Sequence, residues 1–79
     1  MRKVEPKEAA TLLRRGAVLR VATGCAMFNA EFDYTFHDDA LWRGSTESAY
    51  DLDDVRQSVF SWYVVREPES RSSKAVKRT

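Results

Sequence analysis

Residues 6–20 read Pro6-Lys7-Glu8-Ala9-Ala10-Thr11-Leu12-Leu13-Arg14-Arg15-Gly16-Ala17-Val18-Leu19-Arg20, and the pattern changes from helical to extended at one glycine. Apolar residues at positions 9, 12 and 13 are spaced i, i+3 and i+4, which predicts a helix over residues 6–15. Pro6 suits its first turn, and Gly16 suits its C-terminal cap. The apolar run at 17–22 predicts a strand that ends at Thr23-Gly24.

Two more strands are expected between residues 27 and 43. Aromatic and polar residues alternate from Met27 to Phe36 and predict the clearest strand of the chain, with one face on a core and the other in water. The core face would hold Phe28, Ala30, Phe32, Tyr34 and Phe36. A hairpin turn at residues 37–39 then leads to a short strand at 40–43, which stops at Gly44-Ser45.

The last third predicts a loop at 45–50, a short helix and a final strand. Asp51 can cap a helix whose apolar stripe is Leu52, Val55 and Val59. Residues 61–66 are rich in aromatic and β-branched side chains and predict a strand, with Trp62 in the core.

The expected order is therefore helix, strand, strand, strand, helix, strand. Short connections favour antiparallel pairing, so we expect an α+β fold with a three- to four-stranded antiparallel sheet or half-barrel and two short helices over its aromatic face. Residues 1–66 form one domain, and the polar, basic residues 67–79 are predicted to be a disordered tail. The final strand has apolar groups on both faces, which slightly favours a homodimer.

No residue pattern predicts an enzyme, a cofactor or a metal site. Cys25 is the only cysteine and His37 the only histidine, so we expect Cys25 to be a buried structural thiol and not a nucleophile. Asp51, Asp53 and Asp54 begin like a calcium loop, but its glycine and final glutamate are missing. No apolar stretch predicts a signal peptide or membrane span, and a lone thiol fits a cytoplasmic protein.

Charge is strongly polarised along the chain. Residues 21–65 carry eight carboxylates and two basic side chains, whereas residues 1–20 have a net charge of +4 and residues 66–79 of +3. Residues 1–66 have nine basic and ten acidic groups, which argues against direct binding of nucleic acid. Polarity of this kind bears on partners and not on fold.

The acidic middle segment predicts a surface for a protein partner. Carboxylates along an exposed strand and hairpin can imitate a row of phosphates and occupy a basic nucleic-acid groove. The alternative is that they form only the wet face of a half-exposed sheet. Trp42 and Tyr50 lie beside loops, where either can be an interface anchor. The predicted partner-binding residues are Glu31, Asp33, Asp38, Asp39 and Trp42.

Two blocks of the chain resemble small phage-encoded proteins. Residues 8–20 resemble their opening, an amphipathic helix of the "EAL..LK.GKKVRR" kind that runs into a first strand. Residues 51–55 and 60–65 are similar to their close, a short acidic helix and a "DW.V" strand. That broad group includes anti-Thoeris and anti-CRISPR proteins of phages and prophages. Ala22-Thr23 stands where the group has a tryptophan, so no ligand residues are carried over.

The resemblance and the charge together imply an inhibitor of host defence. The first hypothesis is an anti-CRISPR-like protein that binds a CRISPR effector through its acidic surface and blocks nucleic-acid binding. The second is a sponge for a nucleotide-like immune signal, which would require Arg20, Arg43 and Arg56 to converge on one pocket. The third is a small DNA-binding regulator that uses the basic tail.

Overall fold

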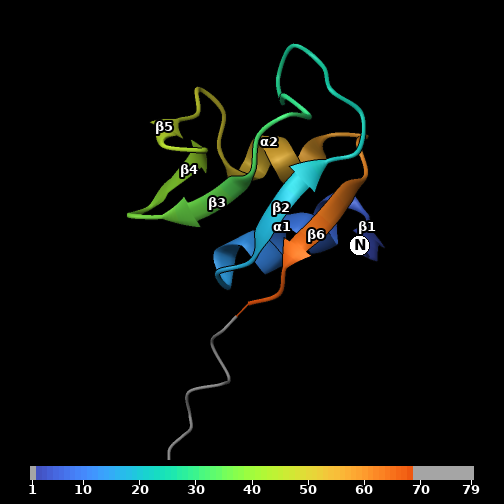
Figure 1. The fold of residues 1–79 in the computed structure, drawn as a ribbon, viewed down its shortest axis with the longest axis horizontal. Helices are drawn as coiled ribbons and strands as arrows, with labels where there is room; N and C mark the ends of the chain where they lie inside the picture. The colour runs from blue at the N-terminus through green and yellow to red at the C-terminus, as the bar shows by residue number, and fades with distance from the viewer. Residues whose placement is uncertain (1, 69–79) are drawn as a thin grey trace, which may run out of the picture.

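A six-stranded antiparallel sheet and two helices make up the fold in the computed structural model, which describes residues 2–68 (Figure 1). In chain order the elements are β1 (Arg2–Val4), α1 (Pro6–Arg14), β2 (Val18–Val21), β3 (Tyr34–His37), β4 (Ala40–Arg43), β5 (Thr46–Glu47), α2 (Leu52–Gln57) and β6 (Trp62–Arg66). The strands lie side by side in the order β1-β6-β2-β3-β4-β5. The predicted α+β class is confirmed, but the described residues form six strands instead of three or four.

The two strands that the sequence did not predict are the edge strands, β1 and β5. β1 pairs with β6, and Val4 opposite Trp62 is only 3% exposed. Hydrogen bonds from the Arg2 guanidinium to Glu67 and to Glu8 raise the pKa of Arg2. They also join β1 to the residue that follows β6 and to the first turn of α1. Such short strands exist because a partner strand pairs with them, not because their own sequence favours extension.

Local signals start both helices where the sequence predicted them, but α2 (Leu52–Gln57) is shorter than expected, and Val59 of the predicted apolar stripe lies beyond it and is 87% exposed. α1 begins at Pro6, and Gly16 at φ +103° lets the chain reverse into β2. α2 follows a capping box, in which the Asp51 carboxylate accepts from the Asp54 amide at 3.1 Å and the Asp54 carboxylate accepts from the Asp51 amide at 2.9 Å. The two helices pack against each other on one face of the sheet (Figure 1).

The core is an aromatic cluster around Trp62. Phe28 and Tyr34 lie edge-to-face with the indole ring, at centroid distances of 5.0 and 5.5 Å, and all three side chains are at most 1% exposed. Such pairs contribute about 0.5–1.5 kcal/mol beyond their buried area. Trp62 and Val64 face the helices, whereas Tyr63 and Val65 face away from them. The predicted division of β6 into two faces is therefore confirmed.

The strand predicted over residues 27–36 is wrong for its first seven residues. Residues 22–33 form a loop that closes on itself, because the Cys25 amide donates to the Phe28 carbonyl at 2.8 Å and the Asn29 amide donates to the Tyr34 hydroxyl at 2.8 Å. Only Leu19 and Tyr34 pair between β2 and β3, so the loop has no partner strand.

Two predictions about buried side chains also need correction. Phe32 was predicted in the core, but it lies in this loop and is 42% exposed. Phe36 and the thiol of Cys25 are half-buried and pack against the edge of the core. Residues 69–79 of the predicted tail lie outside the described residues, and Glu67 is held by Arg2. Neither helix within residues 2–68 has the length and apolar character needed to cross a membrane.

The burial of Val4 makes β1 a testable part of the fold. Val4→Ala removes two buried methyl groups, so the free energy of unfolding should fall by about 2 kcal/mol. The matched control is Lys3→Ala on the same strand, whose side chain is exposed and whose loss should change stability by less than about 0.5 kcal/mol. Urea denaturation followed by circular dichroism measures both, and equal effects of the two substitutions would contradict this role of β1.

Candidate protein-binding surface

The five predicted partner-binding residues lie in three different places. Asp38 and Asp39 form the turn between β3 and β4, which we call the hairpin tip. Glu31 and Asp33 lie in the loop at the other end of β3. Trp42 lies within β4, opposite Thr35. The structure therefore brings together Asp38 and Asp39, and it separates them from the other acids of the predicted row.

The hairpin tip holds the backbone of its two aspartates in a tight turn. Asp38 and Asp39 have φ angles of 53° and 61°, and His37 pairs directly with Ala40 across the turn. Two successive positive φ angles are typical of the tight turns that match the twist of a hairpin, where Asp is tolerated and β-branched residues are not. The Asp38 carboxylate accepts from the His37 Nδ1 at 3.2 Å, and both side chains are exposed.

Trp42 supports this hairpin from its side. Its indole ring stacks on the His37 ring with a centroid distance of 4.8 Å and an interplanar angle of 5°. Its Nε1 donates to the His37 carbonyl at 3.1 Å. The side chain is half-buried, and its one donor is already used. The geometry therefore gives Trp42 a role in holding the hairpin tip in place, whatever else it contacts.

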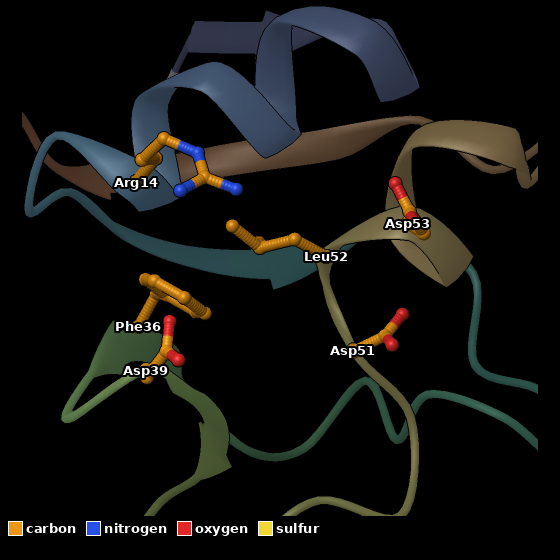
Figure 2. A pocket seen from close by; sticks show the side chains of 6 residues that line it. All are labelled: Arg14, Phe36, Asp39, Asp51, Leu52 and Asp53. Atoms are coloured by element: carbon orange, nitrogen blue, oxygen red, sulfur yellow. The ribbon is translucent and has the colours of Figure 1, made fainter.

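Asp39 lies near two acids from the start of α2. It lines a hollow of about 200 Å³ together with Arg14, Phe36, Asp51, Leu52 and Asp53, which we call the acidic hollow. Figure 2 shows Asp39 beside the Phe36 ring, and Asp51 and Asp53 across the opening on the α2 side. Arg14 lies over Phe36 with 5.5 Å from its guanidinium carbon to the ring centroid. Three carboxylates, one cation and two apolar side chains thus line the acidic hollow.

The remaining acids of the predicted row are partly neutralised or isolated. Asp33 accepts from Arg20 Nε at 2.6 Å, so its charge is balanced by a neighbouring strand. Glu31 is exposed, and its backbone amide donates to the Asn29 carboxamide oxygen at 2.8 Å. Within the acidic hollow, Asp53 pairs with Arg56 at 2.9 Å on its own helix. What distinguishes the hairpin tip is the position of Asp39, which lines a hollow together with Asp51 and Asp53.

Three arginines that a nucleotide sponge would bring together lie apart. Arg20 binds Asp33 beside β2, and Arg56 binds Asp53 on α2. Arg43 lies over the Phe32 ring, with 5.2 Å from its guanidinium carbon to the centroid. Each is engaged with a different partner in a different element. This arrangement gives no observation in favour of a phosphate pocket built from them.

The structure adds Asp51 and Asp53 to the candidate surface. Within residues 2–68, no cluster of three or more His, Cys, Asp and Glu side chains has the arrangement to hold a metal ion. Asp51 and Asp53 were overlooked as surface residues because helix capping already accounted for them. Their approach to Asp39 depends on how α2 docks beside the hairpin, which no local sequence signal encodes.

Comparison with known proteins yields no relative. No family model, no curated protein and no solved structure matches this chain.

The turn conformation predicts that the charge of Asp39 is not needed for folding. Asp39→Asn should change the free energy of unfolding by less than about 0.5 kcal/mol, because Asn also adopts positive φ. Asp39→Val should lower it by about 1–3 kcal/mol, because a β-branched residue is strained at φ 61°. Thermal and urea unfolding of the two variants measure this difference. A large loss of stability in Asp39→Asn would show that the carboxylate itself supports the fold.

Proposed function

We propose that this protein is an inhibitory binding module of a phage or mobile element that occupies a basic nucleic-acid groove of a host defence complex, with a CRISPR effector as the target. The observation that carries the proposal is the hairpin tip with its acidic hollow, in which the carboxylates of Asp38, Asp39 and Asp51 project from two elements of one rigid corner. The partial resemblance to phage anti-defence proteins supports the same function.

Rigid placement is what makes these carboxylates suitable for imitating phosphates. A basic groove binds a row of negative charges that its Lys and Arg side chains are positioned to meet. The tight turn holds the backbone of Asp38 and Asp39, and the capping box holds the carboxylate of Asp51. A surface ordered before binding loses less conformational entropy on binding, which favours affinity.

The acidic hollow also has an apolar floor, which pure charge mimicry would not require. Phe36 and Leu52 line it beneath the carboxylates, and Phe36 is half-buried. A basic side chain of the partner can place its charged group near these carboxylates and its alkyl stem on the part of the floor that Arg14 leaves open. The charges would speed the encounter, whereas the apolar contact would slow dissociation.

Neutralising the hairpin tip tests the proposal. Asp38→Asn/Asp39→Asn keeps a turn that tolerates positive φ and removes two charges from the surface. We expect wild-type protein to protect phage in hosts that carry an active CRISPR system, and the double variant to need about tenfold more protein for equal protection. Plaque assays over a panel of hosts, each with one characterised CRISPR type, measure this, with expression matched by immunoblotting.

The matched control removes two negative charges from another part of the surface. Glu31→Gln/Glu47→Gln changes exposed acids of the long loop and of β5, and it should leave protection unchanged. Loss of protection in this control with retention in the hairpin variant would move the binding surface to the far end of β3. Absence of protection by the wild type in every host would refute the proposed function.

A further inference from the structure

The face of the sheet opposite the helices is uncovered and carries a different chemistry from the acidic hollow. α1 and α2 both lie on one side of the sheet (Figure 1). Strand alternation then directs Tyr63 and Val65 of β6 to the open side, where they are 36% and 37% exposed. The positions on β1, β2 and β6 that face this side hold no acidic residue.

The strand register places a cation on each side of the exposed tyrosine. Lys3 on β1 and Arg20 on β2 are both directly opposite Tyr63 on β6, and both are exposed. Directly opposed residues have Cβ atoms about 4.5–5.5 Å apart and share one face of the sheet. Lys3, Tyr63 and Arg20 therefore form one row across three neighbouring strands, which we call the basic row.

Asp33 positions one of these cations without removing all of its donors. Its carboxylate accepts from Arg20 Nε at 2.6 Å, and both side chains remain more than two-fifths exposed. A guanidinium has five N–H donors, of which this bond uses one. The pair orders Arg20 at the end of the basic row and leaves donors for an anionic oxygen.

A groove lies beside the basic row, between Asp33, which pairs with Arg20, and Val65, two residues along β6 from Tyr63. It has a volume of about 280 Å³ and is lined by Val18, Asp33, Thr35, Gly44, Val65 and Arg66. The groove forms because β2 and β3 share only the Leu19–Tyr34 pair and separate on either side of it. An open channel beside an aromatic ring and two cations can accommodate an extended chain.

We infer that this face binds single-stranded nucleic acid, with a base stacked on Tyr63 and phosphates on Lys3 and Arg20. Sequence-tolerant strand binding in proteins combines exposed aromatic rings with a positively charged groove. A paired duplex does not present the faces of its bases, and an acidic peptide has none, so the tyrosine between two cations favours a single strand. The near-neutral charge of residues 1–66 hides this face, because the strand register gathers Lys3 and Arg20 on it, with Asp33 paired to Arg20. The inference does not depend on the proposed function.

Fluorescence anisotropy with the full chain and labelled twelve-nucleotide oligothymidylate tests this inference. Wild type should bind the single strand more tightly than a duplex of equal length. Tyr63→Leu, which keeps an apolar side chain, should weaken binding about tenfold, and Tyr63→Phe should retain it, because stacking needs only the ring. Residues 69–79 are the same in all of these proteins, so their charge cannot account for the difference.

A pair of charge-balanced variants separates local from overall electrostatics. Arg20→Gln/Asp33→Asn removes the cation and its partner at unchanged net charge and should weaken binding and its salt dependence. Arg56→Gln/Asp53→Asn does the same to a similar exposed pair on α2 and should have no effect. Thermal melts of each variant establish that it is folded. Equal binding by Tyr63→Leu and wild type, equal affinity for duplex, or equal competition by polyglutamate would overturn the inference.

Discussion

The packing of Trp62 against Phe28 and Tyr34 is the interaction on which the rest of this structure depends. The three rings meet edge-to-face in the centre of a small core, and Trp62 belongs to β6, which pairs with both β1 and β2. Once the indole is directed towards the helices, period-two alternation directs Tyr63 to the opposite side. The buried indole nitrogen has no hydrogen-bond partner within the described structure, so ring packing and apolar burial have to offset that loss.

The same constraint separates two surfaces of opposite character. On the helix side, α2 docks beside the β3–β4 hairpin, and Asp51 and Asp53 thereby come to lie across a hollow from Asp39. On the open side, the register of β1, β6 and β2 aligns Lys3, Tyr63 and Arg20. A chain with a net charge of +1 therefore has an acidic hollow and a basic row, which an overall charge cannot reveal.

Sequence predicted those parts of the fold that local chemistry determines. Gly16 ends α1, the Asp51 capping box starts α2, and the two-aspartate turn joins β3 to β4. Each of these three signals lies within a few residues of the structure that it specifies. The edge strands β1 and β5 escaped prediction, because each is too short to show a pattern and depends on a partner strand. Pairing of β1 with β6 joins opposite ends of the chain.

The long loop shows why alternation alone was misleading. Residues 27–33 alternate like a strand, but Gly24 approaches Ala30 so closely that a Cβ at Gly24 would lie 3.2 Å from the Ala30 amide nitrogen. This contact closes the loop and denies it a neighbouring strand. The predicted row of carboxylates is divided because Asp33 precedes β3 and Asp38 follows it, and half of the candidate surface, from α2, could be found only from tertiary packing.

Hydrogen–deuterium exchange on the protein bound to an effector tests most directly whether the hairpin tip and the acidic hollow are the binding surface. The effector complex would be purified from a host in which the protein blocks interference, and exchange would be compared between free and bound protein. The account predicts protection of amides in the hairpin around Asp38-Asp39 and at the start of α2. Protection confined to residues 22–33, with the hairpin and α2 unchanged, would contradict it.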